Sequence, residues 1–183
     1  MSDTDSSRRK FLAGSAGGIS AAWLLANWPA GVAAAEAARA GGGFAFFSKP
    51  EAIEIDAMAA QIFPTTDTPG AREAQAVYFI DLALVTFAQD KQAIYKTGLG
   101  ELQGKTKGMF PSAASFSAMS DGQQIQLLTA IETTSFFKTV RDHTIMGMFS
   151  APKHSGNYRK VGWTLIDFDD SLNFKAPFGA YDA

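Results

Sequence analysis

Residues 7–12, Ser-Arg-Arg-Lys-Phe-Leu, place two adjacent arginines ahead of a long segment that carries no charge. Arg8 and Arg9 form the pair, and Phe11 and Leu12 are the apolar residues that follow it. A basic head, a weakly apolar run and small residues beyond it are typical of a twin-arginine export signal. That route carries proteins that have already folded, often with a cofactor or a partner inside. We therefore expect the rest of the chain to fold into a stable domain before export.

The end of this leader is predicted by its small residues. Pro-Ala-Gly at residues 29–31 breaks any helix, and residues 33–35 and 35–37 both fit the small-x-small pattern of a cleavage site. The alternative is an uncleaved membrane anchor, because residues 11–35 carry no charge and a span needs about 20 apolar residues. The glycines, Asn27 and Pro29 make the run only weakly hydrophobic, which favours cleavage. The predicted organisation is an export signal (1–37), a linker (38–47) and one domain (48–183).

Composition sets the limits of what this domain can be. Cleavage after Ala37 leaves 146 residues, enough for one domain with a proper core. The net charge is −2 and stays there without the leader, so the chain does not favour nucleic acid. Cysteine is absent, which excludes disulfides, thiolate metal sites, iron–sulfur ligation and covalent haem attachment in this chain.

Hydrophobic periodicity and capping signals predict an all-α fold. Ser48 with Glu51, and Ser120 with Gln123, have the spacing of capping boxes and indicate helix starts. Helices are expected over residues 49–63, 69–87, 90–102, 121–131 and 136–149, the last as a continuation of the fourth, with a loop over 104–115. After residue 150 the pattern fails, and only residues 164–168 resemble a short strand. The prediction is a single helical domain of about five helices with a long, irregular, aromatic-rich C-terminal tail.

Residues that bear chemistry are few and scattered. His143 and His154 are too isolated for a zinc site, and we expect capping or surface roles for both. The acids at 167, 169 and 170 lack the glycine and glutamate of a calcium loop. No glycine-rich dinucleotide motif, P-loop or serine-esterase motif occurs, so no cofactor or metal site is predicted in this chain.

The remaining charged residues on the expected helices are interpreted structurally. Two acidic pairs, Glu51 with Glu54 and Glu73 with Asp81, are read as solvated faces. Arg141 lies among apolar residues of the last helix, and we expect its guanidinium to donate to backbone carbonyls of the loop beyond residue 149.

Aromatic residues are in excess. The chain holds 15 Phe, three Trp and four Tyr, and many crowd into residues 44–47, 149–163 and 168–181, where helical patterning is weak. One helical core of this size does not easily bury all of them, and aromatic residues in irregular segments often form a partner surface. The candidate interface residues are Phe149, Asn157, Trp163, Phe174, Phe178 and Tyr181. The alternative is that the tail folds back and completes the domain's own core. For Trp163 we expect a place in this core as readily as a place on a partner surface.

Two blocks carry a resemblance to a known family. The first is residues 62–74, Ile-Phe-Pro-Thr-Thr-Asp-Thr-Pro-Gly-Ala-Arg-Glu-Ala, followed by Phe-Ile-Asp at 79–81. The second comprises Phe136, Phe137, Arg141, Thr144, Gly147, Phe149, Ser150, Pro152, Gly156, Asn157, Gly162 and Trp163. Together, over about residues 48–168, they resemble the gluconate 2-dehydrogenase subunit 3 family. His154, where that family usually has tyrosine, and Asp167, where it usually has glycine, depart from the pattern.

The resemblance implies that the protein functions as one subunit of a larger complex. Members of that family are small subunits of exported, membrane-associated dehydrogenases. Their partners are a flavoprotein of the glucose–methanol–choline type, which carries FAD, and often a multihaem cytochrome c. The flavoprotein commonly lacks a signal and is exported with the small subunit. The expectation is a non-catalytic periplasmic subunit that supports folding, export and assembly of a sugar or alcohol dehydrogenase. The alternatives are a free-standing periplasmic binding module and an enzyme that acts alone.

Overall fold

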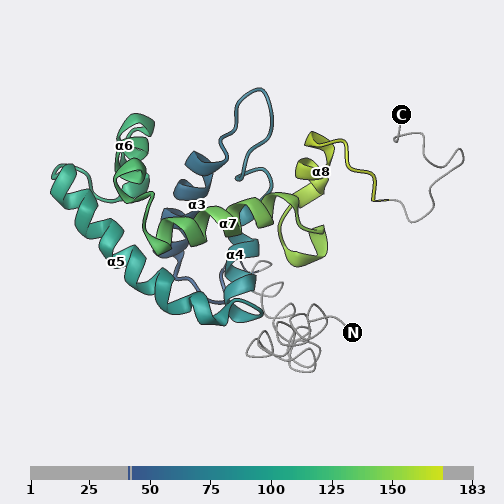
Figure 1. The fold of residues 1–183 in the computed structure, drawn as a ribbon, viewed down its shortest axis with the longest axis horizontal. Coiled ribbons are helices and arrows are strands. Elements are labelled where there is room, and N and C mark those ends of the chain that lie inside the picture. The colour runs from purple at the N-terminus through teal and green to yellow at the C-terminus, as the bar shows by residue number, and fades with distance from the viewer. Residues whose placement is uncertain (1–40, 42, 171–183) are drawn as a thin grey trace, which may run out of the picture.

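The computed structural model describes residues 41 and 43–170, and in this part of the chain the fold is all α (Figure 1). Its α-helices are α3 (Lys49–Ile62), α4 (Ala76–Val85), α5 (Gln92–Met109), α6 (Asp121–Ile131), α7 (Ser135–Phe149) and α8 (Val161–Leu165). Short 3-10 turns connect them: η2 (Gln89–Lys91), η3 (Phe116–Ala118), η4 (Pro152–His154) and η5 (Tyr158–Lys160). The all-α prediction is confirmed. The strand expected at residues 164–168 is wrong, because that segment begins inside α8.

Both predicted capping boxes are present. The backbone N–H of Ser48 donates to the Glu51 carboxylate at 2.8 Å, and that of Ser120 donates to the Gln123 side chain at 3.1 Å. These bonds satisfy N–H groups that have no partner within a helix. The continuous helix expected through residue 149 is instead two helices. The second begins after Thr134, whose hydroxyl accepts the Phe137 N–H at 3.2 Å.

The bounds of α4 and α5 differ from those expected. The helix predicted from Pro69 begins only at Ala76, because Gln75 has a left-handed backbone with φ of 55° and the helix cannot continue back through it. In the opposite direction, α5 continues through Gly104 to Met109, where a loop was expected. A buried threonine, Thr106, donates from its hydroxyl to the Leu102 carbonyl at 2.8 Å within this last part of α5.

The centre of the domain is α4. Eight of its ten residues are buried, and it is apolar on nearly every side, as a helix surrounded by protein should be. It packs against α3 and α7. The core gathers side chains from all helices between α3 and α7, and its largest fully buried hydrophobic members are Tyr95, Phe116, Ile55, Met58, Ile80, Leu82, Leu84, Leu102, Leu127, Met148 and Val140.

Asp81 on α4 is buried rather than solvated, which corrects the interpretation drawn from its acidic pairing. Only 2% of Asp81 is exposed, and its carboxylate accepts the backbone N–H groups of Ala45 (2.7 Å), Phe46 (2.9 Å) and Phe47 (3.0 Å). Phe47 is itself in the core. Several hydrogen bonds to one carboxylate offset the cost of burying its charge. Residues 44–47 therefore pack as part of the domain rather than as a linker.

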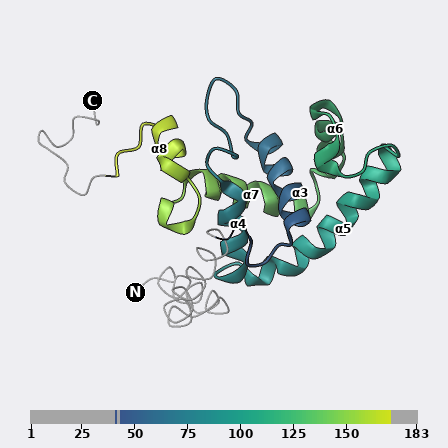
Figure 2. The same cartoon turned by 180° about the vertical axis from the view of Figure 1, so that it is seen from behind.

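Different helices lie at the two ends of the molecule. In Figures 1 and 2, α5 and α6 lie at one end and α8 lies at the other, with α3, α4 and α7 between them. In the described part of the chain, every helix is too short or too polar to cross a bilayer.

Candidate partner-binding site

The two sequence blocks, far apart in the chain, meet at the α8 end of the molecule. The Phe63 and Phe149 rings contact edge to face, with centroids 5.8 Å apart. The backbone N–H of Tyr158 donates to the carbonyl of Ala74 at 3.1 Å. A shallow pocket of about 380 Å³ lies between residues 67–69 and α8. We call this region, residues 62–75 and 147–168, the junction.

The loop half of the junction is shaped by Glu73. Its carboxylate accepts the Gly70 N–H at 2.8 Å and the Thr65 hydroxyl at 2.7 Å. These bonds lower the pKa of Glu73, the threonine bond most, so it stays ionised. Gly70 sits under the Phe63 and Pro64 backbone, where an added Cβ would lie 2.6 Å from the Phe63 carbonyl oxygen. Glycine is needed there because the backbones approach so closely.

The other half of the junction is organised by Asn157, whose exposure is 0%. Its backbone N–H donates to the Gly147 carbonyl at 2.7 Å, and its side-chain amide donates to the Ser150 carbonyl at 3.0 Å. Its side-chain oxygen accepts the Gly162 N–H at 2.8 Å. Asn157 thus joins the end of α7 to the start of α8. Its side chain is not available to a partner here, which corrects its placement among the candidate interface residues.

The connection from α7 to α8 has an unusual backbone. Left-handed φ angles occur at Ser155 (71°), Asn157 (46°), Arg159 (54°) and Lys160 (60°), and again at Asp167 (54°). Residues other than glycine rarely adopt this conformation, which costs free energy at each position. Such outliers persist only where the surroundings enforce them, and they gather at functional sites.

Apolar side chains reach solvent on α7 and around α8. Ile145 and Met146 on α7 are 44% and 43% exposed, and Tyr158, Ile166 and Phe168 are 38%, 55% and 52% exposed. Sequence reasoning missed Ile145, Met146 and Ile166, because it weighed aromatic crowding rather than exposure. Their signal was weak: Ile145 and Met146 merely fall between the buried positions 144, 147 and 148. Tyr158 lies in the aromatic segment 149–163 but was not singled out.

Two other predicted interface residues are half-buried in the junction. Phe149 contacts Phe63, and the Trp163 indole N–H donates to the Phe149 carbonyl at 2.7 Å. The Trp163 ring also contacts Phe168, with centroids 5.0 Å apart. Phe174, Phe178 and Tyr181 lie outside the described residues, as do the leader residues Arg8, Arg9, Phe11 and Leu12.

The expected roles of Arg141 and His143 are wrong. The exposed Arg141 guanidinium pairs with the neighbouring Asp142 carboxylate at 2.8 Å instead of bracing the loop beyond Phe149. His143 is buried, and its Nδ1 lies 3.0 Å from the Tyr95 hydroxyl. Burial lowers the pKa of His143 and raises that of Tyr95, so both are neutral near pH 7. The pair joins α7 to α5 inside the core.

His154, also expected at a cap or the surface, is half-buried on η4, and burial lowers its pKa. Within residues 43–170, no three side chains of His, Cys, Asp or Glu are grouped closely enough to hold a metal ion.

The described residues thus form an all-α domain in which the two sequence blocks meet at one end. The family model described as gluconate 2-dehydrogenase subunit 3 matches residues 49–169. The chain belongs to this family, which confirms the resemblance found in the two blocks. Membership of a family named for the third subunit of a dehydrogenase indicates an accessory subunit of a dehydrogenase complex. No curated protein and no solved structure matches the chain.

Proposed function

We propose that this chain is the non-catalytic small subunit of a periplasmic sugar or alcohol dehydrogenase. In this proposal the catalytic partner is a flavoprotein of the glucose–methanol–choline type that carries FAD, often joined by a multihaem cytochrome c. The small subunit supports the folding, export and assembly of the flavoprotein. The complex is associated with the inner membrane from the periplasmic side.

The observation that carries the proposal is the convergence of the two family blocks on the junction. The blocks are separated by more than 50 residues, yet they contact through Phe63 and Phe149 and through Ala74 and Tyr158. Exposed Ile166 and Phe168 lie at the same end. Exposed apolar side chains that gather on one surface are a feature of protein interfaces, where a few buried anchors supply most of the binding free energy.

Export supports the same proposal. The Arg8–Arg9 pair is typical of a signal for folded cargo, and a flavoprotein must fold to hold its FAD. A small subunit with a signal can carry a signal-less flavoprotein through the same machinery, provided that the two bind each other in the cytoplasm. Stable binding before export is therefore a requirement of the proposal.

The test is purification of the tagged chain from the periplasm of its native host, followed by an absorption spectrum. The proposal expects a larger flavoprotein to co-purify, with flavin absorption in that complex and none in the chain purified alone. FAD bound by the isolated chain would instead favour the alternative that it is an enzyme by itself. A chain that emerges alone from the periplasm would favour a free-standing binding module.

A further inference from the structure

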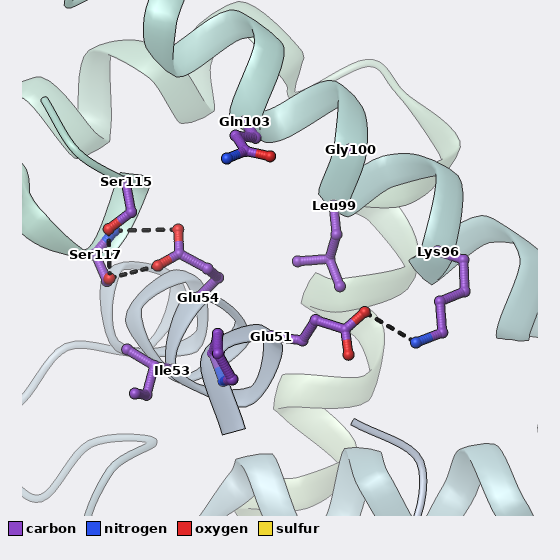
Figure 3. Close-up of a pocket in the computed structure, with 10 residues that line it drawn as sticks. Glu51, Ile53, Glu54, Lys96, Leu99, Gly100, Gln103, Ser115 and Ser117 are labelled. Carbon is purple, nitrogen blue, oxygen red and sulfur yellow. Dashed lines mark hydrogen bonds and ion pairs between the residues drawn. The ribbon is translucent and has the colours of Figure 1, made fainter. Parts of the chain in front are cut away.

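A pocket of about 540 Å³ lies between α3, α5 and the segment around η3 (Figure 3). The pocket is lined by both apolar and polar side chains. Ile53 of α3, which is 49% exposed, and Leu99 of α5 supply apolar surface. Glu54, Gln103 and Ser115 supply oxygen atoms that can accept hydrogen bonds. The pocket lies outside the junction and is not part of either family block.

One edge of the pocket is electrically balanced. The Lys96 ammonium pairs with the Glu51 carboxylate at 2.9 Å, and Glu51 also accepts the Ser48 N–H at 2.8 Å. This pair is visible at one side of Figure 3. Because its positive charge is already matched, Lys96 does not strongly repel a second cation that enters the pocket.

The other edge carries an unmatched negative charge. The half-buried Glu54 carboxylate accepts the Ser117 N–H at 3.3 Å and the Ser117 hydroxyl. Among residues 43–170, no lysine, arginine or histidine lies within ion-pair distance of it. Two bonds from Ser117 fix the carboxylate, and Gln103 lies across the pocket from it (Figure 3). A preoriented carboxylate with oxygen acceptors nearby favours a cation that carries several N–H donors.

We propose that this pocket receives an arginine or lysine side chain of the dehydrogenase partner. The cationic head pairs with Glu54, and the aliphatic stem packs on Ile53 and Leu99, because long basic side chains bury their stems and keep their heads polar. The proposal rests on the proposed function for the identity of the partner. The chemistry of the pocket, an anionic site with apolar walls, stands on the residues themselves.

A single partner can contact both the pocket and the junction. Pro50 at the pocket and Ile62 at the junction lie near opposite ends of α3, about 18 Å apart by the rise of the helix. An interface of standard size covers about 800 Å² on each side, a patch about 30 Å across. The pocket therefore falls within reach of a partner centred on the junction.

Glycines on α5 allow a sharp steric test in the assembled complex. A Cβ added at Gly100, which lines the pocket, or at Gly108, two turns further along α5, meets no atom within 4 Å. Gly100→Phe should fill the pocket mouth and reduce dehydrogenase co-purification about tenfold. Gly108→Phe, the matched control, should leave co-purification unchanged. Equal co-purification by the two variants, with unchanged melting temperatures, overturns the proposal.

Charge is tested by a second pair of variants. Glu54→Gln keeps an oxygen that Ser117 can bond but removes the charge, and it should weaken co-purification about tenfold. Glu101→Gln removes an exposed carboxylate from the same helix as Gly100, outside this pocket, and should have no effect. An effect of equal size from both glutamates would show that overall charge matters rather than the pocket, and would overturn the proposal.

The occupant itself can be identified by photo-crosslinking. The residue p-benzoylphenylalanine, placed at position 104 of α5, one turn beyond Gly100 and outside the pocket lining, leaves the pocket open. In the co-expressed complex it should link to a partner peptide that contains an arginine or lysine at or beside the attachment point. Links confined to this chain, or to a second copy of it, would assign the pocket a different occupant and overturn the proposal.

The last measurement separates failure of the pocket from failure of the proposed function. Nα-acetyl-arginine amide, titrated into the isolated full chain, should shift the backbone NMR signals of Glu54, Leu99 and Gln103 in a saturable way. Its neutral counterpart, Nα-acetyl-citrulline amide, should shift them at least about tenfold less at the same concentration. Equal shifts overturn the pocket proposal. Absence of any dehydrogenase beside the wild-type chain overturns the proposed function, whatever the titration shows.

Discussion

Asn157 lies where the chain turns from α7 into α8, and it makes bonds that few other residues can make together. Its amide donates to the Ser150 carbonyl and accepts the Gly162 N–H, while its backbone has φ of 46°. Asparagine tolerates the left-handed region better than most residues and offers both a donor and an acceptor. The residue that was expected to face a partner instead holds the connection between α7 and α8 in place.

Two substitutions separate these contributions of Asn157. Asn157→Ala should lower the free energy of unfolding by about 2–4 kcal/mol, because Ser150 and Gly162 lose buried hydrogen-bond partners and alanine is strained at this φ. Asn157→Gly removes the bonds without the strain and should retain about 1 kcal/mol more stability. Urea unfolding of the two variants measures the difference. Wild-type stability in Asn157→Ala would contradict this account.

His143 makes the stability of the domain depend on pH. Burial lowers its pKa from the ordinary 6.5, and the groups that act on it electrostatically are Asp142, Lys91 and Asp90. The unfolded chain therefore takes up this proton near pH 6.5, and the folded protein takes it up only at lower pH. Between the two pKa values the unfolded state binds more protons, so the stability is present above about pH 6.5 and is lost as the pH falls below it.

The measurement is the urea midpoint at several pH values from about 7.5 down to about 5.0. The wild-type midpoint should fall across this range, and His143→Gln should be less stable at pH 7.5 but show a smaller fall. His154→Gln is the companion variant, because burial also lowers the pKa of His154. If His143→Gln shows the same pH dependence as the wild type, His143 is not the group responsible.

At the scale of elements, helices that begin with a capping box could be predicted well, and helices whose bounds are set by tertiary contacts could not. The starts of α3 and α6 could be predicted from Ser48 and Ser120, because a capping box is formed by residues close together in the sequence. The start of α4 depends on the left-handed Gln75, which no local pattern encodes. The five-residue α8 is too short to show helical periodicity. At the site, aromatic crowding drew attention to Phe149 and Trp163, which lie in the junction. Burial of Asp81 depends on backbone groups more than 30 residues away, and burial of Asn157 depends on how the chain turns from α7 into α8.

The helix α5 shows how the same residue type plays opposite roles. A Cβ on Gly98 would lie 2.1 Å from the Phe136 ring, so this glycine lets α5 and α7 approach each other. Gly104 faces open space, with no atom within 4 Å of an added Cβ. The first glycine is needed for packing, and the second only weakens the helix.

Alanine substitutions should therefore have effects of opposite sign. Gly98→Ala should destabilise the domain by about 1–3 kcal/mol through overpacking against Phe136. Gly104→Ala should stabilise it by about 0.5–1 kcal/mol, because alanine has the higher helix propensity. Thermal unfolding of both variants gives the comparison. Two changes of the same sign would mean that the packing of α5 on α7 is misassigned.

At the scale of the whole molecule, export and assembly are coupled in the proposed function. Changing Arg8 and Arg9 to Lys should retain this chain in the cytoplasm, and the flavoprotein should be retained with it because it depends on the same signal. Fractionation of both proteins from the same cells measures this. A flavoprotein that still reaches the periplasm would refute shared export while leaving the binding surface untested by that experiment.

The binding surface is tested by two isoleucines of nearly equal exposure at opposite ends of the molecule. Ile166 beside α8 is 55% exposed, and Ile125 on α6 is 54% exposed. An aspartate at either position should change the stability of the free chain little, because both side chains already face solvent. Their effects on a partner should differ, because only Ile166 lies in the junction.

The most direct measurement is the dissociation constant of the purified dehydrogenase for the Ile166→Asp and Ile125→Asp chains. We predict that Ile166→Asp weakens binding by at least about tenfold, because a charge would be buried without a partner in an apolar contact, and that Ile125→Asp binds like the wild type. Equal binding by the two variants, or a loss confined to Ile125→Asp, would contradict the assignment of the junction as the partner surface.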